Sequence, residues 1–177
     1  MKKDEARPEE GAAAAALAHL LAAAKALGET PQPHRSLAAL DKALAGTVGH
    51  KLFTVLVLNH ERGLNQRYYS NQPQAYPTGG SKPIETDSAL YREVVSGGRA
   101  RICRDYDDIR RAFFDHELIR SLGCESAVNV PIRWNGATLG TLNLLHEAGW
   151  YGERHLPLLA GFAALAVPAA VEITKRW

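Results

Sequence analysis

The segment VNVPIRWNGATLGTLNLLH, residues 128–146, constrains the fold more than any other part of this chain. Two arms rich in β-branched and apolar residues flank Asn135-Gly136, and this arrangement is the strongest short sequence signal for a β-hairpin. Alternation gives each arm one apolar central face, formed by Val128, Val130 and Ile132 in the first arm and by Leu142 and Leu144 in the second. The segment therefore predicts an antiparallel sheet with helices packed on one face.

The opposite face of this hairpin carries two primary amides, Asn129 and Asn143, near the middles of its arms. A two-residue turn would pair Val128 with Asn143, whereas a three-residue loop with a glycine bulge would set Asn129 directly across from Asn143. We predict the bulged register, because only it leaves both helix-packing faces apolar. A buried amide without partners costs about 1 to 3 kcal/mol. The two amides should therefore satisfy each other or nearby backbone, or hydrogen-bond a ligand or its water.

Hydrophobic periodicity predicts helices at both ends of the chain and strands between them. A first helix at 12–27 has an apolar stripe of Leu17, Leu20, Leu21, Ala24 and Leu27, and a second carries Leu37, Leu40, Leu44 and Val48. Strands are predicted at 52–60, 67–72 and 100–103, with a loop at 73–83, a helix at 88–95 capped by Asp87, and one or two short helices between 106 and 123. A last helix at 153–175 should kink at Pro168, and residues 1–10 should be disordered.

The size and charge of the chain indicate one compact domain without a strong electrostatic field. A chain of 177 residues, 46% of them hydrophobic, can bury a substantial core. The net charge of +2 and the pI near 8.6 favour neither nucleic acid nor an anionic membrane as a partner. We expect residues 1–30 to form an N-terminal tail and an Ala/Leu-rich helix, and residues 31–177 to form a single domain.

The two cysteines, Cys103 and Cys124, are too few for a disulfide framework and lack the spacing of a zinc site. We therefore expect a cytoplasmic protein without a metal site. The N-terminus imitates a signal peptide, but Glu9 and Glu10 precede its alanine run and His19 interrupts it. No stretch has the roughly 18 to 20 uninterrupted apolar residues of a membrane span, so we expect none.

The run RSLGCESAVNVPIRWNGATLGTLNLL, residues 120–145, resembles the signature end of GAF domains. The matching features are a leucine and a glycine before Ser126, the VPI at Val130–Ile132, a short turn, Leu139-Gly140, and an apolar strand followed by a helix. GAF domains are small-molecule sensing modules found in cyclic-nucleotide phosphodiesterases, phytochromes, sensor kinases and transcription activators. The resemblance covers about residues 37–173.

The resemblance implies an α+β fold with a central antiparallel sheet of five to six strands. The N- and C-terminal helices would cover one face and often build a dimer. Short helices and loops, here residues 99–122, would roof a ligand pocket on the other face. The floor of that pocket would be the strands at 53–59, 126–132 and 138–145.

The alternation and the resemblance together give seven candidate ligand-binding residues: Tyr69, Arg101, His116, Ala127, Asn129, Thr141 and Asn143. His116 lies where some GAF domains place a pocket-lining histidine, although a partly buried structural histidine or a haem ligand are alternatives. Bilin attachment is disfavoured, because the neighbours of His116 are Asp115 and Glu117 rather than a cysteine. Arg101 belongs to a run of arginines that could attract an anionic ligand, although nearby aspartates nearly balance that charge.

These observations favour a non-catalytic sensory domain that binds a small molecule and signals through its helices to an effector protein, as a homodimer. No catalytic set of side chains and no cofactor is predicted. One alternative is an enzyme, because one GAF branch reduces free methionine (R)-sulfoxide with cysteines, here Cys103 and Cys124. Another is a pure dimerisation or interaction module whose pocket is filled by apolar side chains.

Overall fold

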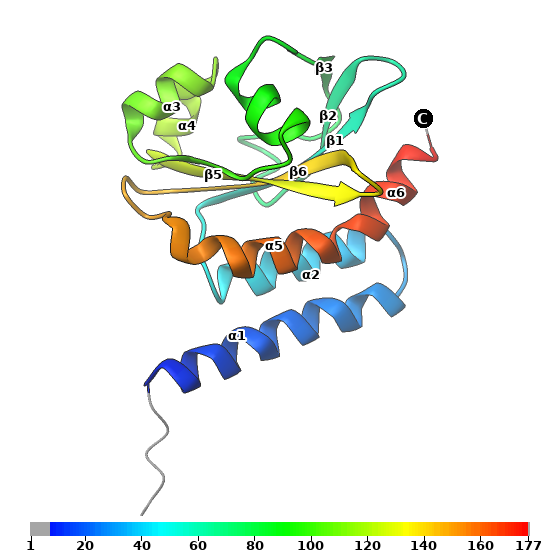
Figure 1. The fold of residues 1–177 in the computed structure, drawn as a ribbon, viewed down its shortest axis with the longest axis vertical. Coiled ribbons are helices and arrows are strands. Elements are labelled where there is room, and N and C mark those ends of the chain that lie inside the picture. The colour runs from blue at the N-terminus through cyan, green and yellow to red at the C-terminus, as the bar shows by residue number, and fades with distance from the viewer. Residues whose placement is uncertain (1–7, 177) are drawn as a thin grey trace, which may run out of the picture.

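An antiparallel sheet of six strands, in the order β3-β2-β1-β6-β5-β4, forms the middle layer of the molecule (Figure 1). The structure is a computed structural model that describes residues 8–176. Its strands are β1 (Leu52–Asn59), β2 (Leu64–Ser70), β3 (Ser81–Pro83), β4 (Arg101–Cys103), β5 (Ser126–Trp134) and β6 (Ala137–His146). Its helices are α1 (Pro8–Lys25), η1 (Ala26–Gly28), α2 (His34–Ala45), η2 (Tyr91–Ser96), α3 (Tyr106–Ala112), α4 (His116–Ser121), η3 (Glu153–His155), α5 (Leu156–Leu165) and α6 (Val167–Thr174). The predicted α+β class and antiparallel sheet are confirmed.

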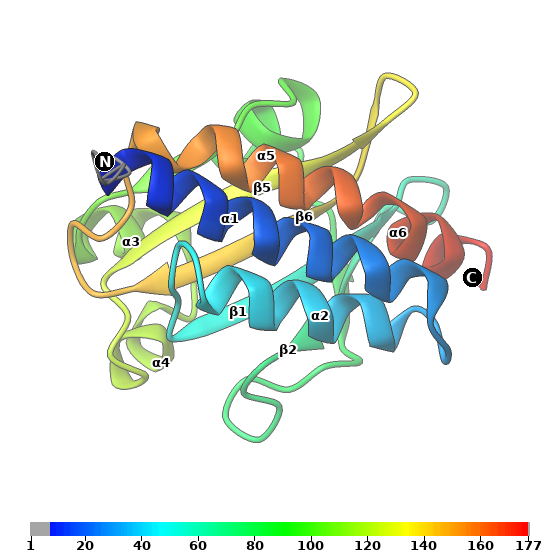
Figure 2. The same cartoon turned by 90° about the horizontal axis from the view of Figure 1, so that it is seen from below.

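Helices α2, α5 and α6 cover one face of the sheet, and α1 lies across α2 and α5 on the outside of this layer (Figure 2). The buried residues of β1, β5 and β6 packed there are all apolar, and the face that they form is called the helix-side face: Phe53, Val55, Val57, Val128, Val130, Ile132, Leu142 and Leu144. The predicted helix-packing residues of the hairpin are among them. Because successive strand residues point to opposite faces, the residues between them form a second surface, the cavity-side face.

The hairpin between β5 and β6 has the predicted register, but its turn and its bulge differ from the predicted ones. Its turn has two residues, Asn135 and Gly136, both with positive φ, and Trp134 pairs directly with Ala137. A bulge follows at Leu139, because Ile132 pairs with Gly140 while Arg133 pairs with Thr138. This extra residue sets Asn129 opposite Asn143. The register is thus confirmed, whereas the predicted three-residue loop is wrong.

Gly140 lies where β6 passes closest to β1. A Cβ atom at this position would come within 2.1 Å of the carbonyl oxygen of Leu56. No side chain can be accommodated there without separating the two strands, so only glycine permits this pairing.

A second bulge, in β2, decides which face its side chains occupy. Val55 pairs with Tyr69, but the next residue, Leu56, pairs with Arg67, so Tyr68 is the extra residue. Arg67 therefore points to the cavity-side face and Tyr69 to the helix-side face. The expectation that Tyr69 faces the cavity is wrong, because the bulge at Tyr68 places Tyr69 on the opposite face from Arg67.

Several predicted boundaries shift. Strand β2 begins at Leu64 rather than at residue 67, and residues 81–83 of the predicted loop pair with it as β3. The helix before β4 is capped by Ser88, whose Oγ accepts the N–H of Tyr91, and not by Asp87. Residues 8–10 of the predicted disordered tail are helical, and residues 1–7 lie outside the described part of the chain.

Helix α1 buries less than its leucine stripe predicts. Ala23 and Ala26 are buried, but Leu17 and Leu21 are 55% and 58% exposed. The segment Gly11–Gly28 also has the length and overall apolar composition that a membrane span can have, although His19 and Lys25 interrupt it, and 11% of it is buried. Signal sequences and core helices of soluble proteins share this length and composition.

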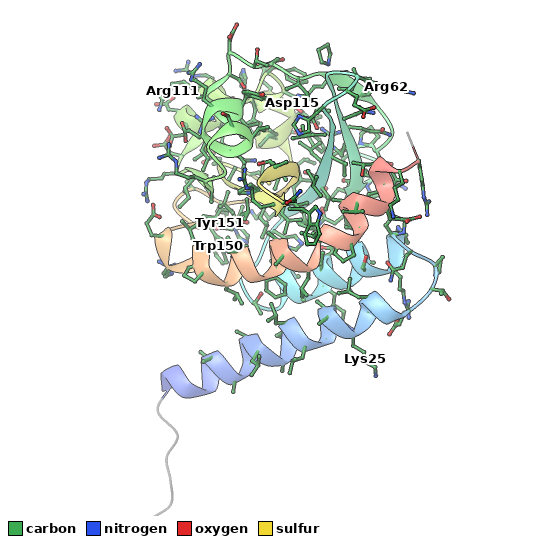
Figure 3. All side chains as sticks on the ribbon, turned by 45° about the vertical axis from the view of Figure 1, so that its right-hand side comes forward. Lys25, Arg62, Arg111, Asp115, Trp150 and Tyr151 are labelled. Carbon is green, nitrogen blue, oxygen red and sulfur yellow. The ribbon has the colours of Figure 1, made fainter. Side chains whose placement is uncertain are left out.

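The C-terminal helix breaks as predicted. Glu153–Leu165 and Val167–Thr174 meet at a bend of 43°. Pro168, near the start of α6, cannot donate a backbone hydrogen bond to the preceding turn, which explains the break. The loop before this helix is anchored on the turn between α2 and β1, since Trp150 Nε1 donates to Val48 O and the Tyr151 hydroxyl donates to Gly49 O (Figure 3 labels both side chains).

Candidate functional site

A cavity of about 130 Å³ lies between the cavity-side face of the sheet and two overlying segments, residues 76–90 and 106–121, which we call the roof. Figure 1 shows the roof on the side of the sheet opposite α2 and α5. The strands contribute Thr54, Leu56, Asn65, Arg67, Asn129, Asn143 and Leu145. The roof contributes Tyr76, Lys82, Glu85, Ser88, Leu90, Ala112, Phe113, Phe114, Asp115 and Ile119. The roof predicted at 99–122 therefore omitted residues 76–90, and the predicted floor omitted β2.

Three side chains at the floor form a directed chain of hydrogen bonds. The Nδ2 of Asn143 donates to the hydroxyl of Thr54 (3.2 Å) and to its carbonyl oxygen (3.4 Å). A carbonyl can only accept, so this contact fixes which end of the Asn143 amide is the nitrogen. Asn143 Oδ1 then accepts from Asn129 Nδ2 at 2.7 Å. We call this chain the amide relay.

The amide relay ends in an unsatisfied acceptor. The side chain of Asn129 is 1% exposed, it lines the cavity, and its Oδ1 has no hydrogen-bond partner. The direction of the relay leaves this atom no alternative orientation, because flipping Asn129 would place two oxygens against each other. A buried acceptor without a donor costs about 1 to 3 kcal/mol. Asn129 Oδ1 is thus a buried acceptor beside the cavity that no group in the described part of the chain satisfies.

Two further unsatisfied atoms come from β2. Asn65 Oδ1 and Arg67 Nε are buried without a partner. The guanidinium of Arg67 is held in place, because its carbon lies 3.6 Å from the centre of the Tyr76 ring and its Nη1 donates to Pro77 O at 2.8 Å. Among the described residues, no carboxylate lies within ion-pair distance of Arg67. Its Nε therefore remains a buried donor that an acceptor in the cavity could satisfy.

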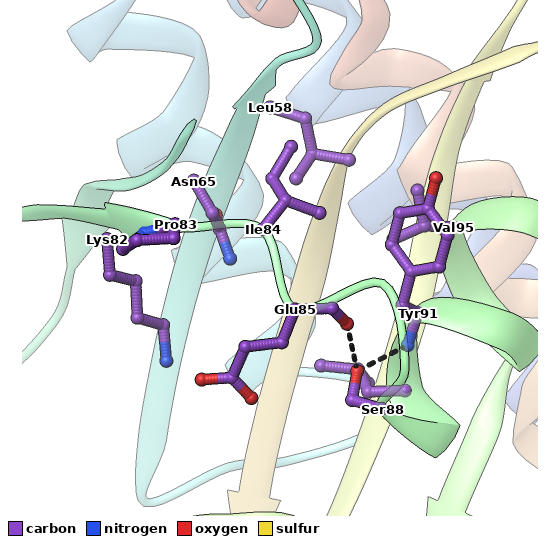
Figure 4. Close-up of a pocket in the computed structure, with 10 residues that line it drawn as sticks. Leu58, Asn65, Lys82, Pro83, Ile84, Glu85, Ser88, Tyr91 and Val95 are labelled. Carbon is purple, nitrogen blue, oxygen red and sulfur yellow. Dashed lines mark hydrogen bonds between the residues drawn. The ribbon is translucent and has the colours of Figure 1, made fainter. Parts of the chain in front are cut away.

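A smaller hollow of about 60 Å³ adjoins the cavity beside β3 and η2 (Figure 4). The two hollows share lining residues, namely Asn65, Lys82, Glu85, Ser88 and Leu90. The Ser88 hydroxyl closes the turn between them by donating to Glu85 O and accepting from Tyr91 N. The polar side chains near Asn65 thus border both hollows.

Tyr76 and Asp115 join the two halves of the roof. The Tyr76 hydroxyl donates to Asp115 Oδ2, and burial together with this carboxylate raises the pKa of Tyr76. Figure 3 shows Asp115 on the opposite side of the sheet from Trp150 and Tyr151. Beneath this contact lies a second apolar cluster, which includes Leu52, Tyr76, Ile109, Ile119, Ala127 and Leu145.

Both cysteines belong to this second cluster. Cys103 and Cys124 are buried and unpaired, and burial raises the pKa of each thiol to about 11. Each sulfur is therefore protonated near neutral pH, which makes it a poor nucleophile. Neither residue lines the cavity. Within residues 8–176, no cluster of three His, Cys, Asp or Glu side chains could hold a metal ion.

The structure brings two of the seven candidate residues into the cavity wall, Asn129 and Asn143. Arg101, Ala127 and Thr141 belong to the cavity-side face of their strands but do not line the cavity. Arg101 approaches Glu93 instead, at 3.9 Å.

The other two candidates lie elsewhere. His116 is on α4, where its Nδ1 and the hydroxyl of Tyr106 are 2.9 Å apart, and it does not line the cavity. Tyr69 packs in the opposite core and donates its hydroxyl to Asp41.

Sequence reasoning missed Asn65, Arg67 and the roof residues Tyr76 and Asp115. Asn65 and Arg67 alternate with Gln66 in the same way that Asn129 alternates with its valine neighbours. This alternation would have identified Asn65 and Arg67 if the predicted strand had begun at Leu64. Tyr76 and Asp115 follow no regular spacing, because their positions depend on how the roof folds back over the sheet.

Comparison with known proteins places this architecture in a family. The family model for the GAF domain matches residues 12–169. No curated protein matches the chain by sequence.

Solved structures share the fold at low sequence identity. The GAF domain of a phosphoenolpyruvate-protein phosphotransferase from Coxiella burnetii is 12% identical, with a TM-score of 0.74, and the match covers 93% of this chain and 97% of that one. The GAF domain of a two-component sensor histidine kinase from Bacillus halodurans is 15% identical (TM-score 0.63; 79% and 94% covered). Free methionine-R-sulfoxide reductase from Neisseria meningitidis, in complex with its substrate, is 17% identical (TM-score 0.67; 94% and 93% covered). Identities this low establish a shared fold only.

Proposed function

The chain belongs to the GAF domain family, and we propose that it binds a small molecule in its cavity without transforming it and relays the binding event to another protein. The observation that carries this proposal is the amide relay, which ends in a buried and unpartnered acceptor at Asn129. A purely structural pair of asparagines would satisfy both oxygens within the protein. Membership of the GAF family supports a sensory role, since these domains commonly bind ligands and regulate other modules.

The volume of the cavity argues against a module with a filled pocket. Leu56, Leu145 and Ile119 border the cavity, yet about 130 Å³ remains open between them. A packed protein interior contains few voids larger than a water molecule. Space of this size next to unsatisfied polar atoms favours binding over passive dimerisation.

The state of the thiols argues against the enzyme alternative. A reductase of free methionine sulfoxide needs a thiolate that reaches its substrate and a second thiol that resolves the product. Cys103 and Cys124 are buried, protonated near neutral pH and absent from the cavity wall. Turnover of free methionine (R)-sulfoxide that disappears in Cys124→Ser would overturn the non-catalytic assignment.

We propose that the signal passes through the terminal helices, in a homodimer. Leu17 and Leu21 expose more than half of their surface on α1, which packs directly against α2 and α5. Closure of the roof on a ligand would shift the sheet and, with it, this helical layer. Light scattering tests the dimer: Leu17→Glu/Leu21→Glu should give a monomer, whereas Lys25→Glu should not. Two unpaired buried cysteines support a cytoplasmic location for the domain.

Native mass spectrometry of the protein purified from its own host tests the binding function. The wild type should carry a small molecule, and Asn129→Leu should lose it. Tyr69→Phe is the matched control, because Tyr69 lies on the opposite face of the sheet and its variant should retain the molecule. The proposal would be contradicted if no compound in a small-molecule extract of the host bound to the wild type and the extract did not raise the melting temperature of the protein.

A further inference from the structure

We infer that the ligand is a short monocarboxylic acid with an uncharged O–H or N–H donor at its far end. This inference rests on the proposed binding function and names the class of molecule that the cavity accepts. It follows from three features of the site: the cavity volume, the acceptor at one end and the donor at the other.

Volume limits the size of the ligand. An engineered protein cavity of roughly 150 Å³ holds one benzene molecule, so about 130 Å³ with an adjoining 60 Å³ accommodates about six to nine non-hydrogen atoms. A nucleotide, a haem or a bilin is several times larger. A molecule of that size would require the roof to separate from the sheet, which would break the contact between the guanidinium of Arg67 on β2 and the Tyr76 ring of the roof.

The inner end of the ligand faces the amide relay. Asn129 Oδ1 accepts hydrogen bonds and cannot donate, so the group against it carries a hydrogen on nitrogen or oxygen. This part of the wall holds amides and a hydroxyl, from Asn129, Asn143 and Thr54, and no carboxylate. An ammonium group would lose its hydration there without gaining a counter-ion, which disfavours a charged donor. A hydroxyl or a carboxamide satisfies the site at lower cost.

The outer end faces Arg67. Strands β1 and β6 separate β2 from β5, and Asn129 lies two residues along β5 from Pro131, the residue in line with Arg67, which puts the backbones of Arg67 and Asn129 about 16 Å apart. Arg67 and Asn129 therefore line opposite sides of the cavity, so one molecule that fills it would have one end near each residue. A carboxylate is the acceptor that a guanidinium binds most strongly, and Lys82, also without an ion pair in the described residues, lines the same region. Glu85 and Asp115 border this end and repel a second negative charge, which favours a monoanion.

Four probes of equal non-hydrogen atom count separate these requirements: 4-hydroxybutanoate, pentanoate, 4-hydroxybutanamide and 4-aminobutanoate. Pentanoate lacks the donor, the amide lacks the charge, and the amino acid carries a charged donor. Isothermal titration calorimetry should show that the hydroxy acid binds about tenfold or more tightly than each of the others, since one buried polar group is left unpaired in each mismatch. The three- and five-carbon homologues of each probe control for length.

Two variants assign each preference to its residue. Asn129→Leu should abolish the preference of hydroxyl over methyl but keep that of acid over amide, and Arg67→Gln should do the reverse. General loss of folding cannot produce this opposite pattern, and Tyr69→Phe should keep both preferences. If pentanoate or the amide binds as tightly as the hydroxy acid at every chain length, or if no probe binds, the ligand class is wrong. A different molecule retained in native mass spectrometry would then leave the proposed binding function intact.

Discussion

The two faces of one sheet are built on different principles. The helix-side face is wholly apolar at the centres of β1, β5 and β6 and is closed by three helices. The cavity-side face carries Thr54, Asn129, Thr141 and Asn143 at the corresponding positions. In the part of the chain that the structure describes, five buried side-chain atoms lack a hydrogen-bond partner, and four belong to sheet residues of this second face: Asn65 Oδ1, Arg67 Nε, Asn129 Oδ1 and Thr141 Oγ1.

This difference separates the residues that hold the domain together from those that we propose to bind a ligand. A residue on the helix-side face contributes to stability through the burial of its side chain, and truncating that side chain leaves a void in a packed layer. A residue on the cavity-side face already borders open space and keeps polar atoms unpaired at a cost to stability. Proteins retain residues that lower their stability mainly at functional sites. Variants matched across the sheet should therefore behave unequally.

The largest difference is expected between the neighbours Leu144 and Leu145, which point to opposite faces of β6. Leu144→Ala should lower the free energy of unfolding by about 2 to 5 kcal/mol, because it empties a closed core. Leu145→Ala should cost about half as much, since its side chain already borders the cavity. Urea denaturation measures both. Equal losses would show that the two faces are packed alike.

The thiols of the second cluster should make stability fall in alkaline solution. Each thiol has an ordinary pKa of 9.0 when unfolded and about 11 when folded. Between these values the unfolded chain releases a proton that the folded chain keeps, so stability decreases as the pH rises from 9 to 11. The decrease is at most about 1.4 kcal/mol per pH unit for each thiol. Cys103→Ala/Cys124→Ala should flatten this dependence in urea titrations at pH 9, 10 and 11; an unchanged slope would assign it to other groups.

The two asparagines should differ in what their loss costs. Asn143→Leu leaves Asn129 Nδ2 without its acceptor and removes the hydrogen bonds to the hydroxyl and carbonyl of Thr54, at about 1 to 3 kcal/mol. Asn129→Leu removes the unsatisfied Oδ1 of Asn129 but leaves Asn143 Oδ1 without its donor, so the number of unsatisfied acceptors stays the same and the loss should be smaller than for Asn143→Leu. Thermal denaturation of both variants without ligand compares them. A larger loss for Asn129→Leu would mean that its Oδ1 is satisfied, by water for example.

The smallest difference in stability is expected between two tyrosines that each donate to a carboxylate, Tyr69 to Asp41 and Tyr76 to Asp115. Removing either hydroxyl should cost about 0.5 to 1.5 kcal/mol. The variants should differ in ligand affinity instead, because only Tyr76 lines the cavity. Tyr76→Phe should weaken binding of 4-hydroxybutanoate in calorimetry, whereas Tyr69→Phe should not. Equal affinities would remove Tyr76 from the site.

Alternation and turn chemistry account for the parts of the fold that could be predicted. Val128, Val130 and Leu142 identify their common face through a period of two, and the need to keep this face apolar identifies the register of Asn129 and Asn143. The direction of the amide relay could not be predicted, because it depends on the carbonyl of Thr54 in another strand.

Other parts of the site depend on contacts that no local pattern encodes. Tyr76 meets Asp115 only because residues 76–90 fold back over the sheet. The leucines of α1 illustrate the same limit, because a clear local pattern there gave a wrong prediction of burial. Their spacing predicts a buried stripe, but α2 and α5 accept Ala23 and Ala26 and leave Leu17 and Leu21 exposed.

The extra residue at Tyr68 has a consequence for comparing this chain with its relatives. Before it, odd-numbered positions of β2 such as Asn65 and Arg67 belong to the cavity; after it, the odd-numbered Tyr69 belongs to the opposite core. A relative whose strand lacks this insertion must be aligned with a one-residue gap at position 68. An ungapped alignment would equate positions on opposite sides of the sheet, and specificity residues inferred from it would be taken from the wrong side.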